Sequence, residues 1–257
     1  MTELPASIRS ALALAHPSWL PVLERGLAAL QAADPGYLDS LAGDDYLPTD
    51  GRMFAAFMQP LPSVRYVLVG EGPYPRAASA TGVCFMDGAV EELWSANGLS
   101  KQVNRATSLR NFIKMLLVAD GLLREDETTG EPMARMSAHA RAIGSPFIQT
   151  LTELQGNLGA HGFLLLNATL VYRPHVPPLK EARAWQPFLA TVLQALAERG
   201  AQAPTLVLWG KIAGQLQGIE AAARLPSVAA EHPYNLSFIH NRAMHALFGP
   251  MRLLYRH

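Results

Sequence analysis

Two hydrophobic patterns alternate along the chain. Short apolar, β-branched runs predict buried strands at 64–69, 163–166, 205–209 and 227–230. Apolar residues at helical spacing predict helices at about 108–124, 145–160, 184–199 and 211–222. Strands that alternate with helices predict an α/β fold, with three α/β/α layers and a central, mainly parallel four-stranded sheet.

The remaining segments add helices and loops to this alternation. Residues 6–33 have helical spacing and end at the turn Asp34-Pro35-Gly36, and a short helical patch is expected around 53–58. Residues 125–144 form a polar excursion, which we expect to be a loop or an inserted helix. No internal repeat is visible, so we expect one domain that spans residues 1–257.

Polar and aromatic residues follow three of the predicted strands. The first strand runs into Gly70 and Glu71, the second into Asn167, and the last into Glu231 and His232. In an open parallel sheet, ligands bind at the carboxyl ends of the strands. The pattern therefore predicts a pocket at that edge of the sheet.

The overall charge gives no sign of a nucleic-acid-binding protein. The formal net charge is zero, with 49% hydrophobic and 16% charged residues, whereas a basic balance would attract phosphates. The distribution is uneven, because residues 95–114 contain no acid but four cations: Lys101, Arg105, Arg110 and Lys114. A charge run of this kind is usually only a solvated face.

The single cysteine excludes an intrachain disulfide and fits a reducing cytoplasm. Residues 1–10 lack the layout of a secretory signal, and no apolar stretch reaches the roughly 20 residues that span a bilayer. We expect a cytoplasmic monomer that does not bind a membrane. The eight histidines show no metal-ligand spacing, so no metal or other cofactor is expected.

Each candidate site residue has a structural reading and a functional one. The loop 70–75 can be a rigid turn, or a backbone that approaches a ligand. Phe85 would by default be a core aromatic, and His232 a structural histidine or a donor to a developing negative charge. Asn167 ends a buried run, where an amide must find partners and can read a planar polar edge.

Taken together, these segments resemble the family 1 uracil-DNA glycosylases. The family's GQDPYH, GLCFS-like, LLLN and HPSPLS segments correspond in order to GEGPYP at 70–75, GVCFM at 82–86, LLLN at 164–167 and HPYNLS at 232–237. Weaker likenesses are Ser108-Leu109-Arg110-Asn111, which is similar to SLKN, and Leu206-Val207-Leu208-Trp209-Gly210, which is similar to FLLWG. The resemblance covers nearly the whole chain except a longer stretch around 120–150.

The resemblance implies that the chain flips a uracil out of single- or double-stranded DNA and hydrolyses its N-glycosidic bond in base-excision repair. Phe85 would stack on the base, Asn167 would read its polar edge, and Tyr74 would exclude the methyl group of thymine. His232 would stabilise the uracil O2 as negative charge develops. Leu236 would be the apolar wedge that enters the duplex. The family's other DNA-contacting positions correspond here to Pro73, Ser108 and Ser237.

Several positions depart from the family pattern. The family's catalytic aspartate falls at Gly72, and a lost general base costs about 10²–10⁴-fold in rate. Glu71 replaces a glutamine, Pro75 a histidine, and Tyr234-Asn235 a Ser-Pro pair. These changes are concentrated in the catalytic loop, while Phe85, Asn167 and His232 are retained.

Three hypotheses remain open at this point. The chain is a glycosylase with an altered mechanism, in which Glu71 or Glu231 supplies the missing carboxylate or Gly72 leaves room for a water ordered by the backbone. Alternatively, it is a catalytically inactive homologue that binds a base or DNA. A third hypothesis is a structural relative that has lost DNA binding. The preferred base also stays open, because Glu71 could favour a base that presents a donor.

Overall fold

The computed structural model describes residues 4–256, so Met1, Thr2 and Glu3 of the N-terminal segment lie outside it. Contacts divide the chain into two compact units that interleave in sequence. The first unit contains the chain up to Gly88, with Gly162–Leu208 and Ile212–Ser227; the second contains Ala89–His161, Trp209–Lys211 and the chain from Val228 onward. The expected single domain stays a prediction, and each unit is described by itself.

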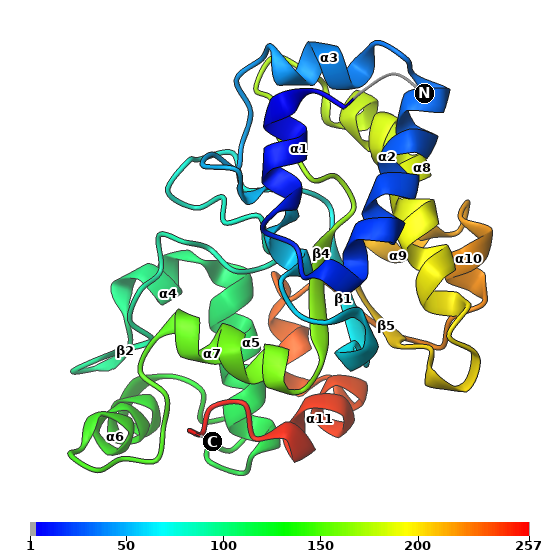
Figure 1. The fold of residues 1–257 in the computed structure, drawn as a ribbon. Helices are drawn as coiled ribbons and strands as arrows, with labels where there is room; N and C mark the ends of the chain where they lie inside the picture. Colours follow the sequence, from blue (N-terminus) through cyan, green and yellow to red (C-terminus); the bar gives the residue numbers. More distant parts are fainter. Residues whose placement is uncertain (1–3, 257) are drawn as a thin grey trace. The chain divides into compact units, whose positions relative to one another are not determined.

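The central sheet confirms the predicted fold class. Its four strands lie in the order β4-β1-β5-β6, and they are β1 (Tyr66–Gly70), β4 (Phe163–Asn167), β5 (Thr205–Trp209) and β6 (Ser227–Ala230). The strands are all parallel and helices flank the sheet, which gives the three-layer α/β/α arrangement. Gly70 pairs with Asn167 at the carboxyl ends of β1 and β4, which lie side by side in Figure 1.

Helices and short 3-10 turns complete both units. The first unit has α1 (Ala6–Leu12), α2 (Leu20–Ala33), α3 (Tyr37–Ala42), α8 (Pro178–Ala197), α9 (Ile212–Leu216), α10 (Glu220–Ala223) and the 3-10 segment η2 (Arg52–Phe57). The second has the hairpin of β2 (Trp94–Ser95) and β3 (Gly98–Leu99), the helices α4 (Lys101–Arg105), α5 (Thr107–Ala119), α6 (Gly130–Arg141), α7 (Leu151–Ala160) and α11 (Arg242–Phe248), and the 3-10 segment η5 (Leu236–His240). Within residues 4–256, no helix combines the length and apolar character needed to cross a bilayer.

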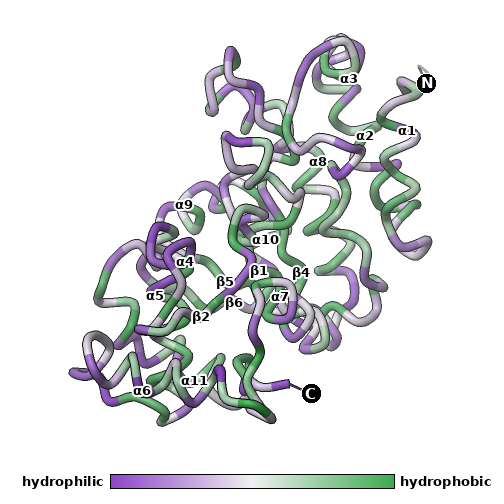
Figure 2. The backbone as a smooth tube through the Cα atoms, turned by 90° about the vertical axis from the view of Figure 1, so that its left-hand side faces the viewer, coloured by the Kyte–Doolittle hydropathy of each residue, from purple (hydrophilic) through white to green (hydrophobic). Residues whose placement is uncertain are grey.

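The core of the first unit forms because α2 and α8 pack closely. A Cβ atom at Gly26 of α2 would lie only 2.7 Å from the Phe188 ring of α8, so a glycine is needed at this crossing. The Phe188 ring of α8 meets Phe54 in a tilted contact, and it meets Phe57 and Trp185 in edge-to-face contacts. The strands β1 and β4 are buried against this core, and Figure 2 colours most of both as hydrophobic.

All four predicted strands are present, whereas several helix ends differ from the prediction. The helix expected at 108–124 ends at Ala119, before Gly121 takes a positive φ of 71°. The helix expected from 145 begins at Leu151, where Thr150 and Glu153 form a capping box. The polar excursion contains α6, α8 begins earlier than expected, and the stretch 211–222 divides into α9 and α10.

A buried polar network holds the segment that follows β4. The Arg173 and Glu181 side chains are 6% and 5% exposed and form an ion pair. The Tyr37 hydroxyl donates to Glu181 at 2.7 Å, and Arg173 also reaches Asp44 at 3.2 Å. Buried charges are tolerated when each is paired and hydrogen-bonded. The network therefore anchors the segment between β4 and α8 at the end that leads into α8.

Asp120, at the end of α5 in the second unit, predicts a pH-dependent stability. Both carboxylate oxygens are buried and have no hydrogen-bond partner among the described residues. Burial raises the Asp120 pKa to about 6, against an opposing effect of Arg252. The folded pKa of Asp120 lies above the ordinary value of 3.8. Its contribution to the free energy of unfolding is therefore fully present below pH 3.8 and is lost as the pH rises through 6.

We therefore expect Asp120→Asn to stabilise the protein above pH 6. The amide removes the cost of a buried carboxylate, about 1–2 kcal/mol, and the gain should shrink as the pH approaches 4. Thermal unfolding of both proteins at pH 4, 6 and 8 measures this. An equal difference in melting temperature at all three pH values would contradict the assignment.

Candidate functional site

The carboxyl ends of β1 and β4 approach each other closely in the first unit. A Cβ atom at Gly70 would lie 2.5 Å from the Cys84 sulfur and 3.1 Å from the Asn167 side-chain oxygen. Asn167 is 4% exposed, so its amide is held in the interior at the end of the strand. Glycine at 70 therefore lets the buried amide and the thiol share one small space.

The loop after β1 stays bonded to the segment after β4. The Ala168 N–H donates to the Gly70 carbonyl at 2.8 Å, and the Thr169 N–H donates to the Glu71 carbonyl at 3.2 Å. The Thr169 hydroxyl donates to the same Glu71 carbonyl at 2.8 Å. The Glu71 side chain is exposed, while Gly72 and Pro73 are half-buried. The strand ladder thus fixes the backbone of the predicted catalytic loop.

Phe85 has an unusual backbone conformation for a bulky residue. Its φ is 69°, in the left-handed region, which costs a residue other than glycine about 1–3 kcal/mol. The surrounding loop holds it there, because the Thr81 hydroxyl donates to the Met86 carbonyl at 2.9 Å and the Cys84 N–H donates to the Leu165 carbonyl at 3.0 Å. Such strain is concentrated at functional sites, which supports a functional role for the half-buried Phe85.

Tyr74 and Cys84 lie near each other in the first unit, and both are neutral. Burial raises the pKa of the Cys84 thiol to about 12. Burial, together with the neighbouring Cys84 and Asp87, also holds the Tyr74 pKa well above its usual range. Neither group ionises near neutral pH. Both therefore supply shape and a low-dielectric wall, not charge.

A cavity lies along the loop that contains Gly72. Its volume is about 290 Å³, and Glu71, Gly72, Pro73 and Thr169 line its loop side. Residues of the anchored segment and α8, among them Tyr172 and Leu179, line the rest. The cavity is large enough for ordered water beside Gly72.

In the second unit, His232 is held in a defined tautomer. The Tyr234 N–H donates to His232 Nδ1 at 3.1 Å, so the proton of a neutral ring lies on Nε2. A Cβ atom at Gly210, whose φ is 66°, would come within 2.9 Å of the His232 Cβ, so glycine is needed beside the histidine. The ring is exposed and can offer an Nε2–H donor.

Glu231 braces the same loop. It accepts a hydrogen bond from Asn241 at 2.7 Å. Burial would raise the Glu231 pKa, but hydrogen bonds from Ser237 and Asn241 outweigh it and lower the pKa below its ordinary value. The Glu231 carboxylate and the predicted DNA-contacting Ser237 are therefore engaged with each other.

Asn111 is a positioning residue whose role was not evident from the sequence. Its side chain is fully buried in α5, and its amide donates to the Pro233 carbonyl at 2.7 Å and to the Tyr234 carbonyl at 3.3 Å. The signal was present as a polar residue among the apolar residues Leu109, Phe112 and Ile113. Thr169 was also missed, although it lies two residues after the strand-end Asn167.

Leu236 and Tyr234 project from the loop that Asn111 and Glu231 hold. Their exposed fractions are 65% and 68%, and both are among the few large hydrophobic residues exposed in the described chain. Exposed apolar side chains on a braced loop are typical of binding surfaces. The position of Leu236 fits the wedge role that the resemblance implies.

The cationic stretch around Ser108 is only partly a surface. Ser108 lies in the first turn of α5, which has neither a side-chain cap nor an acidic residue, so its N–H groups can meet an anion. Lys101 and Arg105 are exposed, and Arg110 is half-buried. Lys114 is 8% exposed, and burial, with Arg110 nearby, lowers its pKa. Lys114 therefore does not belong to a solvated cationic face.

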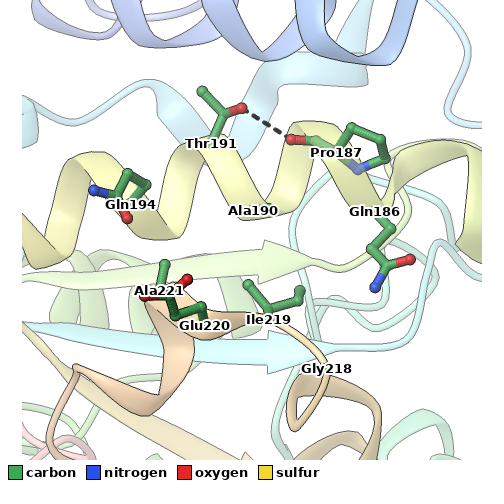
Figure 3. Close-up of a pocket in the computed structure, with 9 residues that line it drawn as sticks. All are labelled: Gln186, Pro187, Ala190, Thr191, Gln194, Gly218, Ile219, Glu220 and Ala221. Carbon is green, nitrogen blue, oxygen red and sulfur yellow. Dashed lines mark hydrogen bonds between the residues drawn. The ribbon is translucent and has the colours of Figure 1, made fainter. Parts of the chain in front are cut away.

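Another pocket of the first unit lies apart from the loops described above. It has a volume of about 500 Å³ and lies between α8 and the segment 218–221, where Thr191 donates to the Pro187 carbonyl at 2.9 Å (Figure 3). None of the predicted site residues lines it. Within residues 4–256, no group of three histidine, cysteine or acidic side chains is arranged to hold a metal ion.

The crowding at Gly70 leads to a prediction about coupling. Gly70→Ala should destabilise the protein by about 1–3 kcal/mol because the new methyl group would overlap the Cys84 sulfur. In a Cys84→Ala background the same change should cost at least about 1 kcal/mol less. Urea unfolding of the four proteins in this double-mutant cycle measures the coupling. Equal costs in both backgrounds would show that the two residues do not crowd each other.

Known proteins resemble the chain over its full length. No family model matches it. The wild-type UNG crystal structure from Nitratifractor salsuginis is 39% identical, with a TM-score of 0.90, and the match covers 100% of both chains. Curated relatives named uracil-DNA glycosylase are 29% identical in Thermobifida fusca, over 80% of this chain and 72% of the relative, and 28% identical in Corynebacterium glutamicum, over 86% and 81%. This chain therefore belongs to the uracil-DNA glycosylase family and is similar to its family 1 members.

Proposed function

We propose that the protein binds a flipped uracil in DNA and hydrolyses the N-glycosidic bond, as an enzyme of base-excision repair. The observation that carries this proposal is the arrangement at the ends of β1 and β4. A buried Asn167 amide lies beside Gly70 and Cys84, and the next residue, Phe85, is held in a strained conformation. Together with the family membership, this arrangement fits the recognition of one planar base.

The residues of the first unit divide base recognition between them. An asparagine amide can donate to one carbonyl and accept from one N–H, which matches the polar edge of uracil. The ring of Phe85 offers a stacking face, and the neutral Tyr74 fills space beside it. Tyr74 would clash with a methyl group at C5, so thymine would be excluded on steric grounds.

The second unit supplies the donor and the DNA contacts. By the family resemblance, His232 in its Nε2–H form would be the donor to the uracil O2, where negative charge develops as the glycosidic bond breaks. The first turn of α5 with Ser108 offers N–H groups to a phosphate, and Arg105 and Lys101 add positive charge. Leu236 fills the space in the duplex that the flipped base leaves.

We propose that the activity is weak, because glycine stands where the family has its catalytic aspartate. Loss of such a carboxylate costs about 10²–10⁴-fold in rate. Glu231 is a poor replacement, since its carboxylate is engaged by Asn241 and Ser237. Gly72 also supports the second candidate, a homologue that binds uracil in DNA without cleaving it.

A cleavage and retention assay distinguishes the two candidates. Single- and double-stranded oligonucleotides with one uracil are incubated with the protein, and abasic sites and gel retention are scored. We expect slow cleavage that Asn167→Ala and His232→Ala each lower by about 10²-fold or more. The matched control is a thymine oligonucleotide. Retention without any cleavage would favour the binding homologue. The absence of both cleavage and retention would contradict both candidates.

The wedge role of Leu236 predicts a difference between substrates. Leu236→Ala should lower cleavage of duplex uracil by about tenfold and leave single-stranded uracil nearly unchanged, because only the duplex must be unpaired. Single-turnover rates on both substrates measure the ratio. The fully exposed Ile143 provides a control, since Ile143→Ala should change neither rate. An equal loss on both substrates would contradict the wedge role.

A further inference from the structure

The Thr169 hydroxyl occupies the space into which a side chain at position 72 would project. A Cβ atom built at Gly72 lies 2.4 Å from Thr169 Oγ1, far inside a normal contact, and 3.8 Å from the Thr169 Cβ and carbonyl oxygen. The close contact is thus with the hydroxyl alone. The loop has this form because residue 72 has no side chain.

The distance of 2.4 Å between a Cβ at position 72 and Thr169 Oγ1 matches a distance within an aspartate side chain. With standard bond lengths, a carboxylate oxygen of an aspartate lies about 2.4 Å from its own Cβ. Thr169 Oγ1 is therefore as far from the position-72 Cβ as an aspartate oxygen at that position would be. Thr169, two residues after β4, thus brings an oxygen atom to the same distance from that Cβ position.

Hydrogen bonding defines how this oxygen can act. The hydroxyl uses its proton toward the Glu71 carbonyl at 2.8 Å, which leaves its lone pairs as acceptors. Thr169 is 6% exposed, and the residue lines the cavity of about 290 Å³ beside Gly72. Its rotamer is therefore fixed, and the residue borders a cavity that has room for a water.

We propose that Thr169 orients the attacking water in place of the missing aspartate. This inference rests on the proposed function. One O–H of the water donates to Thr169 Oγ1, which directs the water oxygen toward C1′ of the sugar. The new C1′–O bond forms as the C1′–N1 bond breaks, and the electron pair of the C1′–N1 bond leaves with the uracil. The water's proton passes through solvent to the uracil, which is released neutral.

The first test distinguishes a role of Thr169 in orienting the water from a purely structural role of this residue. Thr169→Val keeps the shape but removes the hydroxyl, and Thr169→Ser keeps the hydroxyl. Single-turnover cleavage of uracil DNA should fall by about 10–100-fold in Thr169→Val and stay near the wild-type rate in Thr169→Ser. Affinity for an oligonucleotide with a non-hydrolysable 2′-fluoro-deoxyuridine should be unchanged in both.

Each outcome of this test is decisive. If the wild-type protein leaves uracil in DNA, the proposed hydrolysis is wrong, and the role of Thr169 in it is overturned as well. If the wild type cleaves and Thr169→Val cleaves equally fast, only the role of Thr169 is wrong. If Thr169→Val loses affinity in proportion to its rate, or Thr169→Ser is as slow as Thr169→Val, the residue is merely structural.

The second test restores the family's carboxylate. Gly72→Asp alone should give no gain in rate, because its Cβ would collide with Thr169 Oγ1 and displace the loop. Gly72→Asp with Thr169→Ala has room for the carboxylate and should exceed the wild-type rate by at least about tenfold. A full gain from Gly72→Asp alone, with nothing added by Thr169→Ala, would overturn the proposal.

Discussion

The hydrogen-bond ladder between β1 and β4 continues past the ends of both strands, and the candidate site of the first unit depends on it. Because Ala168 and Thr169 donate to the carbonyls of Gly70 and Glu71, the two loops run alongside each other at very short range. Side chains at positions 70 and 72 would overlap Cys84 and Thr169. Glycine at both positions is thus a consequence of the ladder, and the departure from the family pattern at Gly72 has a local physical reason.

In the second unit, hydrogen bonds fix a loop that carries exposed side chains. The loop 231–237 is fixed from within by Glu231 and from α5 by the buried amide of Asn111. This bracing sets the tautomer of His232 and leaves Leu236 and Tyr234 projecting into solvent. Side chains that are already ordered lose less conformational entropy when DNA binds, so this bracing favours binding.

Much of this arrangement could be predicted from the sequence, because it follows from local pattern. The four strands, their parallel direction, and the positions of Asn167 at one strand end and His232 just after another follow from apolar runs and from the geometry of parallel sheets. Helix ends were less predictable, since the capping box at Thr150 and the left-handed Gly121 decide them. The roles of Thr169 and Asn111 depend on contacts between residues about 100 positions apart in the chain, which a single sequence does not reveal.

The ends of β1 and β4 are proposed to form a site for one uracil ring. A crystal structure of the protein with free uracil bound tests this most directly. We expect the ring to stack on Phe85, with the Asn167 amide at hydrogen-bond distance from a ring carbonyl and N–H. Uracil bound elsewhere, or a Phe85 ring that packs into the core when uracil is present, would contradict it.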